Sequence, residues 1–256
     1  MKKTPEQIRK TVDSAVYNQQ IITFVTYMLT DYGEETLRIA LSGILERYGR
    51  MDIFDIAYTA AKELIINGTK ANLKRILFKK MNLDMTDEDD YNKGMDYFRA
   101  NLTEDKIRSY KNHFKESNLP VITTIYYSPN VLNIKVKNNF TLLPIEEKRI
   151  REKFSNATSF ANLFDFFMEY GEQAEGAGLG ITMVGILLDQ SGIDKHAFTL
   201  YSSRKYNETI AKLEIPLTED YIPKRVKFSQ EMEESGKSPD MLRAEFHYTF
   251  KDFKKR

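Results

Sequence analysis

A glycine-rich stretch is the first place in this sequence where residue types and spacing suggest chemistry. Residues 175–182 read Glu-Gly-Ala-Gly-Leu-Gly-Ile-Thr, and an apolar run covers residues 183–188. Alternate glycines let the backbone turn tightly and come close to a ligand, and a helix that begins there offers unpaired N–H groups at its positive end. The stretch predicts a phosphate-binding turn, while a tight turn before a core helix remains the alternative.

This stretch does not match the fingerprint of a dinucleotide-binding loop. That fingerprint requires a preceding strand and a third glycine or alanine at position 181, where the chain has Ile181. The upstream residues 164–174 are aromatic and acidic rather than strand-like. The glycines alone therefore do not name a ligand, and a second site is needed.

A predicted helix that begins near Asp52 supplies that second site. Four polar residues on it are spaced by four, three and four positions: Glu63, Asn67, Lys70 and Lys74. At this spacing they project from one side of the helix within about three turns. A carboxylate, an amide and two ammonium groups in one row can hold a metal ion, a water molecule and phosphate oxygens. A solvated Glu–Lys face is the alternative interpretation.

The elements that would position these residues follow from the apolar pattern. Residues 121–127 and 131–136 read as two strands joined by a turn at 128–130, and residues 198–202 and 210–215 read as two more. Residues 1–50 read as helical, with Thr4 as N-cap before Pro5, although residues 21–29 also favour a strand. We expect a helical hairpin there, which packs on the main domain or forms a homodimer.

Composition excludes several classes of protein. The 256 residues carry a formal net charge of +1, which argues against a general nucleic-acid binder. There is no cysteine and only three histidines, so neither disulfides nor a Cys-based zinc site is predicted. The sequence begins with polar residues and contains no run of about 18 apolar residues, which predicts a cytoplasmic protein without a membrane segment.

Two segments resemble motifs of the GHKL superfamily, which includes histidine kinases, gyrase-type topoisomerases and mismatch-repair ATPases. Residues 63–72, Glu-Leu-Ile-Ile-Asn-Gly-Thr-Lys-Ala-Asn, are similar to its N box. The glycine stretch at 176–180 is similar to its G2 box, Gly-x-Gly-Leu-Gly. The resemblance implies an α+β fold, a two-layer α/β sandwich of Bergerat type, over residues 51–216. Residues 81–119 would be a helical insertion that a minimal member lacks, and residues 144–175 occupy the place of the ATP lid. Residues 217–256 are a highly charged C-terminal tail.

The chain departs from this family where the adenine would be read. The family has an Asp-x-Gly-x-Gly box after the strand that follows the N box, and its carboxylate accepts a hydrogen bond from the adenine amino group. Here that place reads Lys-Asn-Asn-Phe-Thr-Leu at 137–142, so Asn138 replaces the carboxylate and both glycines are absent. An amide can accept or donate, which leaves the base preference open between adenine and another base.

The resemblance also implies roles for individual residues. Asn67 would coordinate Mg²⁺, Lys70 would contact a phosphate oxygen, and Glu63 would act as general base on the attacking group. Backbone N–H groups and one hydroxyl would hold the phosphates of ATP, and they belong to Gly176, Gly178, Leu179, Gly180 and Thr182.

Three functions are compatible with these motifs. The chain lacks a His-Glu/Asp phosphoacceptor box, so a kinase of this type would transfer phosphate to a protein partner in trans. An ATPase switch would couple hydrolysis to a partner, and a degenerate member would bind a nucleotide or a protein without turnover. An α/β binding module with coincidental motifs is the remaining alternative.

Overall fold

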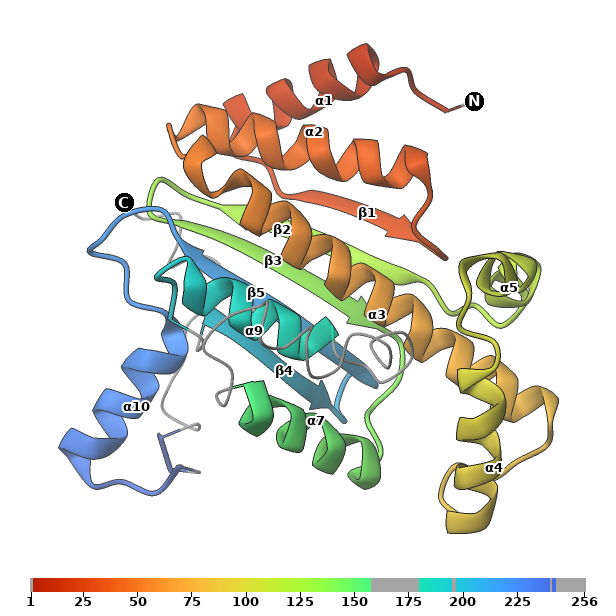
Figure 1. Cartoon of the computed structure of the whole chain (residues 1–256). Coiled ribbons are helices and arrows are strands. Elements are labelled where there is room, and N and C mark those ends of the chain that lie inside the picture. The colour runs from red at the N-terminus through yellow and green to blue at the C-terminus, as the bar shows by residue number, and fades with distance from the viewer. Residues whose placement is uncertain (1, 158–179, 195–196, 240, 243–256) are drawn as a thin grey trace.

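The computed structural model describes residues 2–157, 180–194, 197–239 and 241–242. It shows an α+β protein in which helices cover an antiparallel sheet (Figure 1). The helices are α1 (Pro5–Tyr17), α2 (Asp31–Arg47), the short 3-10 helix η1 (Met51–Ile53), α3 (Phe54–Lys80), α4 (Glu88–Arg99), α5 (Glu104–Ser109), α6 (Lys111–Glu116), α7 (Pro144–Ala157), α9 (Gly180–Gln190) and α10 (Lys224–Ser235). The strands are β1 (Ile22–Thr26), β2 (Val121–Tyr127), β3 (Val131–Asn138), β4 (Phe198–Ser203) and β5 (Glu208–Pro216).

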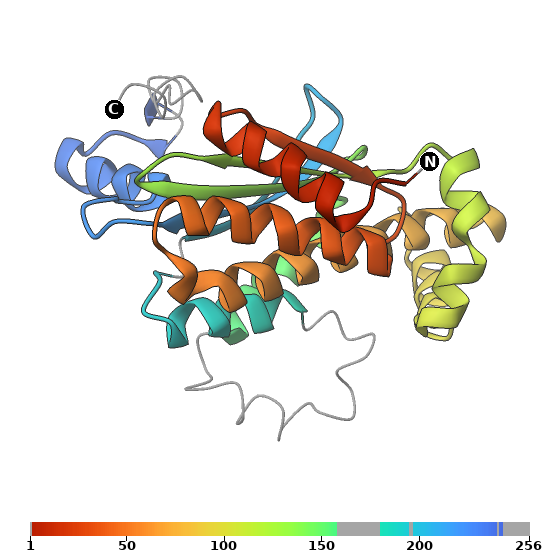
Figure 2. The same cartoon turned by 90° about the horizontal axis from the view of Figure 1, so that it is seen from above.

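The five strands pair antiparallel in the order β1-β2-β3-β5-β4. Alternate residues point to opposite faces, so one face collects the apolar side chains of β2, β3 and β5, among them Ile125, Ile134 and Leu213, all fully buried. Figure 2 shows α2, α3 and α9 on one side of the sheet, and these side chains form one core with the helices. The α+β class predicted from the sequence is confirmed at this level.

Helix α3 is the long element that joins the two cores of the molecule. Its first part packs on the sheet through residues such as Ala61 and Ile65, which are fully buried. Its last turns carry Leu73 and Leu77 into a second apolar cluster with residues of α4 and α6. Residues 81–119 thus form a helical lobe around the end of α3, at the right of Figure 1.

The expected N-terminal helical hairpin is wrong in one respect. The two helices form, with Thr4 capping α1, but the segment between them is strand β1, which pairs with β2 from Ile22↔Ile125 to Thr26↔Val121. The β-branched and aromatic residues of 22–26 favour a strand, and the free edge of β2 supplies the hydrogen-bond partners that decide the matter. Residues 1–50 therefore extend the sheet as well as contributing helices.

The expected lid segment and the expected tail are described only in part. Residues 144–157 of the lid segment form helix α7, and residues 158–175 lie outside the described residues. In the tail, residues 240 and 243–256 lie outside them as well. None of the helices in the described part of the chain combines the length and apolar character that crossing a bilayer requires.

Candidate functional site

The polar row predicted on α3 is present, and three of its members have side-chain groups without a partner among the described residues. Glu63, Asn67 and Lys70 are all partly exposed on this helix. No hydrogen bond or ion pair joins the side chain of Glu63 or of Lys70 to another described residue. The Nδ2 atom of Asn67 is enclosed and likewise has no hydrogen-bond partner there. Because enclosed polar atoms are normally paired, this amide is a candidate for contact with a ligand.

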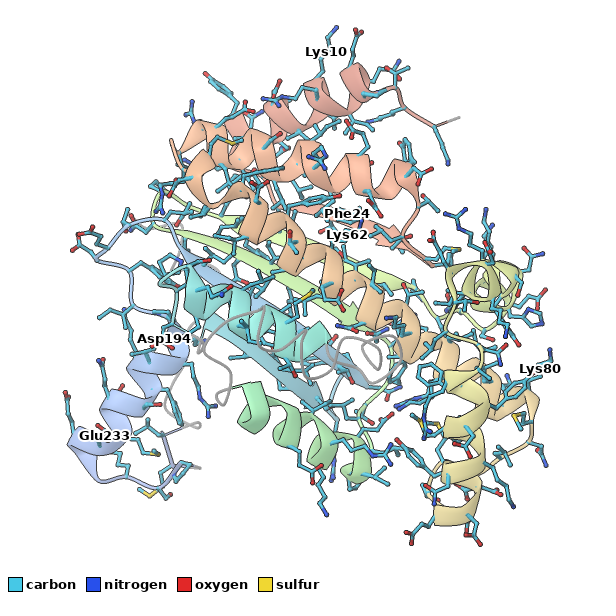
Figure 3. All side chains as sticks on the ribbon, viewed as in Figure 1. Lys10, Phe24, Lys62, Lys80, Asp194 and Glu233 are labelled. Atoms are coloured by element: carbon cyan, nitrogen blue, oxygen red, sulfur yellow. The ribbon has the colours of Figure 1, made fainter. Side chains whose placement is uncertain are left out.

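Two other lysines of α3, by contrast, form ion pairs with carboxylates of neighbouring helices. Lys62, labelled in Figure 3, donates to Glu34 of α2 at 2.7 Å. Lys74, the fourth member of the predicted row, is paired with Glu146 of α7. Lys62 and Lys74 are therefore paired, while Glu63, Asn67 Nδ2 and Lys70 between them have no side-chain partner in the part of the chain that the structure describes.

The end of the glycine stretch lies directly against this centre. A Cβ atom placed on Gly180 would come within 1.7 Å of Oε1 of Glu63 and 2.7 Å of Nδ2 of Asn67. The first residue of α9 thus approaches α3 so closely that only glycine fits without movement of these side chains. Val184 and Leu188, both fully buried, pack α9 into the main core and hold it beside α3 (Figure 1).

The other predicted residues of the glycine stretch divide into two groups. Thr182 lies in the first turn of α9 and is 2% exposed. Gly176, Gly178 and Leu179 lie outside the described residues. The structure therefore brings together Glu63, Asn67 and the end of the glycine stretch.

Asn138 ends β3 beneath α3 and is held there by two hydrogen bonds. Its Nδ2 donates to the backbone oxygen of Gly68 at 3.0 Å and to Oδ1 of Asn72 at 2.6 Å. Asn72, which is fully buried, donates in turn to the backbone oxygen of Leu119 at 2.7 Å. Asn72 was not among the predicted site residues. It could have been found as a polar residue on the apolar face of a predicted helix, because such a buried residue needs hydrogen-bond partners.

Two hydroxyl residues beside Asn138 were also missed. Thr209 of β5 is the register partner of Asn138, and Ser202 of β4 is the register partner of Thr209, so all three lie on the helix-covered face. The Thr209 hydroxyl donates to the backbone oxygen of Phe140 at 2.6 Å, and the Leu142 N–H donates to Ser202 Oγ at 2.8 Å. These bonds tie the segment after β3 across the ends of β5 and β4.

A buried ion cluster closes the other end of the row. Arg75 donates to both carboxylate oxygens of Glu146, at 2.7 and 2.6 Å, and Lys74 and the Leu143 N–H also donate to this carboxylate. Burial raises the pKa of Glu146, but the Arg75 hydrogen bond and the charges of Lys74 and Arg75 outweigh burial and bring the pKa to about 2. Burial lowers the pKa of Lys74 to about 8, although Glu146 opposes the change.

Tyr91 of α4 joins this cluster to the helical lobe. It is 2% exposed, and its hydroxyl accepts a hydrogen bond from Arg149 of α7 at 3.2 Å. The Arg149 guanidinium lies 4.8 Å from the centre of the Tyr91 ring, and the Lys74 ammonium lies 5.7 Å from it. The cluster thus contains three cations and one carboxylate, and it connects α3, α4 and α7.

Comparison with known proteins gives one relative of unknown function. An uncharacterized protein of Treponema pallidum (strain Nichols) is 29% identical over 211 residues, which are 82% of this chain and 40% of the relative. The chain thus spans about two-fifths of that relative's length. No family model matches the chain, and no solved structure matches it. The functional argument therefore depends on the site itself.

Proposed function

We propose that this chain is a nucleotide-binding domain of GHKL (Bergerat) type that binds ATP with Mg²⁺ between α3, the start of α9 and the end of β3. The observation that carries the proposal is the contact of Gly180 with Glu63 and Asn67. Two segments far apart in sequence, each similar to a motif of one superfamily, meet at side chains that have no partner among the described residues. A purely structural contact would be expected to pair them.

The residues present suit a magnesium–phosphate group. Mg²⁺ takes oxygen ligands and keeps several waters and phosphate oxygens in its shell, so the Asn67 carbonyl would serve as its protein ligand beside them. When bound, the ion would neutralise phosphate charge. Lys70, one turn further along α3, would contact a phosphate oxygen, and Glu63 would orient or deprotonate the attacking group. Backbone N–H groups at the start of α9, with the Thr182 hydroxyl, would hold the terminal phosphates.

The reaction that we propose is transfer of phosphate to a protein partner, or hydrolysis coupled to one. None of the three histidines is followed by Glu or Asp, so the sequence has no His-Glu/Asp phosphoacceptor box. We therefore expect the acceptor on another chain.

A degenerate module without turnover is the second candidate. The observation that favours it is Asn138, which stands where a family member has a carboxylate and gives both its N–H groups to α3. Loss of a charge-assisted hydrogen bond of about 1.5–3 kcal/mol weakens binding about ten- to a hundredfold. The nucleotide would then still bind, at lower affinity, and a protein partner would recognise the nucleotide-bound form.

Calorimetric titration with ATP, ADP and GTP, with and without Mg²⁺, tests the proposal. We expect Mg²⁺-dependent ATP binding that falls at least about tenfold in Asn67→Ala, which corresponds to about 1.4 kcal/mol, and also in Gly180→Val. Lys62→Ala is the matched control, because Lys62 lies on the same helix but pairs with Glu34. Absence of nucleotide binding by folded wild-type protein would contradict the proposal, and turnover would separate the two candidates.

A further inference from the structure

The sheet has a second face, on the side opposite α2, α3 and α9, and the proposed nucleotide site does not use it (Figure 2). Side chains alternate along each strand, so the neighbours of the core residues Ile125, Ile134 and Leu213 point to this side. Its aromatic and basic members lie in neighbouring rows across four strands: Tyr126 of β2, Lys135 and Lys137 of β3, Lys212 of β5 and Tyr201 of β4. We call this surface the second face.

The lysines of the second face are crowded and only partly neutralised. Lys135 and Lys212 are register partners on neighbouring strands, and Lys137 lies two residues further along β3. Lys137 is paired with Glu208 at 2.9 Å. Lys212 is likewise paired with Glu214, but no ion pair joins Lys135 to a residue in the described ranges. The centre of this face therefore holds a positive charge without a counter-ion in the part of the chain that the structure describes.

The surroundings of Lys135 disfavour its charge. Burial lowers the pKa of this lysine, the charge of Glu208 opposes the change, and the charges of Lys137 and Lys212 add to it. Like charges directly opposite each other on two strands also destabilise a sheet. An anion bound at Lys135 would remove this repulsion, and it could approach from solvent, because all three lysines are partly exposed.

Two tyrosines of the second face leave ring surface exposed. Tyr201 is 43% exposed, and Tyr126 is partly exposed. Burial raises the pKa of both hydroxyls, and the charge of Glu208 also raises both, so both rings lie within electrostatic range of one carboxylate. Ile210, the register partner of Lys137 and Tyr201, points to the same side and is 1% exposed. The side chains of this face thus cover an apolar centre and present rings and ammonium groups to solvent.

The hairpin between β4 and β5 extends the same combination of groups. Its turn, residues 204–207, projects on the side of the sheet away from α9 in Figure 2. Tyr206 is 66% exposed, and the Lys205 ammonium lies 5.2 Å from the centre of its ring. Arg204 and Lys205 are exposed, and no ion pair joins either of them to another described residue. Rings and unpaired cations therefore occur together from Lys135 to the tip of this hairpin.

We propose that the second face, with the β4–β5 hairpin, is a binding surface for single-stranded nucleic acid. Bases would stack on the rings of Tyr201 and Tyr206, and the cations that lack a carboxylate partner would contact phosphates. Exposed rings beside cations on an open sheet suit this ligand, because every base has a face that can stack and every linkage carries a negative charge. An acidic protein segment would match the cations but would leave the exposed rings without a function. The net charge of +1 describes the whole chain and does not exclude a local basic surface.

Fluorescence anisotropy with labelled single strands of about twelve nucleotides tests the proposal, with oligothymidylate and oligouridylate as the DNA and RNA arms. We expect binding at low salt in at least one arm, and the arm that binds more tightly identifies the preferred sugar. The logarithm of the binding constant should fall against the logarithm of the salt concentration with a slope of about −2, as expected for phosphate contacts from Lys135, Arg204 and Lys205.

Substitutions separate stacking from charge. Tyr201→Ala should weaken binding at least about fivefold, whereas Tyr201→Phe keeps the ring and should bind like the wild type. Tyr17→Ala is the matched control, since Tyr17 is 75% exposed on α1. Lys135→Ala should reduce the size of the salt slope by about 0.7, whereas Lys10→Ala, exposed on α1 in Figure 3, should leave it unchanged. An unchanged slope in folded Lys135→Ala would overturn the role of that lysine.

The remaining outcomes separate this inference from the proposed function. Saturating ATP with Mg²⁺ should leave oligonucleotide binding unchanged, and so should Asn67→Ala, because that site lies on the other side of the sheet. Displacement of the oligonucleotide by ATP would overturn the inference, since the strand would then occupy the nucleotide site. Competition by polyglutamate together with full affinity in Tyr201→Ala would overturn it in favour of an acidic protein partner. Absence of oligonucleotide binding by folded wild-type protein would overturn it while leaving ATP binding in place.

Discussion

Polar side chains on α3 fall into two groups, according to whether the fold supplies them with partners. Asn72 is hydrogen-bonded to Leu119, just before β2, and to Asn138 at the end of β3. Lys74 and Arg75 are paired with Glu146 of α7. The side chains of Glu63 and Lys70 have no such bond, and the enclosed Nδ2 of Asn67 has no acceptor, among the described residues. Enclosed polar atoms are normally paired, so the Asn67 Nδ2, which has no partner among the described residues, is the strongest indication of a ligand on this helix.

Asn138→Asp tests the structural part of the site at the residue scale. A carboxylate cannot donate, so one oxygen would face the Gly68 and Asn72 oxygens at 3.0 and 2.6 Å. We expect the free energy of unfolding to fall by about 2–4 kcal/mol, from two lost bonds and a buried unpaired charge. Urea denaturation measures this. A change below about 0.5 kcal/mol would show that the two bonds do not hold β3 to α3.

At the scale of elements, Glu146 anchors the start of α7 to α3. Its carboxylate is 6% exposed and accepts hydrogen bonds from Lys74, from Arg75 and from the Leu143 N–H of its own helix start. Such a pair is not expected to add much net stability over apolar residues, yet removing one partner leaves buried charges without compensation. The contact therefore fixes the position of the start of α7 relative to the polar row on α3.

Glu146→Gln should destabilise the protein by about 3 kcal/mol at pH 7. Because the pKa of Glu146 falls from 4.5 to about 2 on folding, its contribution is complete above about pH 4.5 and is lost as the pH drops toward about 2. The difference between wild type and variant should therefore shrink over that range, as measured by denaturation at several pH values. Glu152→Gln, exposed on the same helix, is the control. A difference that stays constant down to pH 2 would rule out this assignment.

At the scale of the whole molecule, α3 belongs to both apolar cores. Its first half packs on the sheet, and its last turns pack in the helical lobe, toward Lys80 in Figure 3. A helix of 27 residues that is buried at both ends transmits loss of packing from one core to the other. We therefore expect the lobe and the sheet domain to unfold together.

Gly94→Ala tests this coupling. A Cβ atom on Gly94 would lie 2.2–2.5 Å from ring atoms of Phe78, which is 1% exposed. We expect a loss of about 1–3 kcal/mol from overpacking, in a single transition seen equally by tyrosine fluorescence and circular dichroism. Lys93→Ala, on the exposed side of α4, should change stability by less than about 0.5 kcal/mol. Two separate transitions, with only the first one lowered, would show that the lobe unfolds independently.

Local patterns in the sequence determined much of the architecture. The capping signal of Thr4 and Pro5, the long apolar face of α3 and the alternation in β2, β3 and β5 were sufficient to predict these elements, because each reflects preferences within a few residues. The spacing of Glu63, Asn67 and Lys70 was sufficient to predict that they share one side of a helix.

Only the tertiary structure decided what depends on contacts between distant segments. The strand β1 formed because β2 offered an edge, against the helical preference of its neighbours. Lys74 belonged to the same row as Lys70 but was taken up by Glu146, 72 residues away. The approach of Gly180 to Asn67 and the orientation of Asn138 by Asn72 are likewise set by packing between elements, and spacing along one helix carries no information about them.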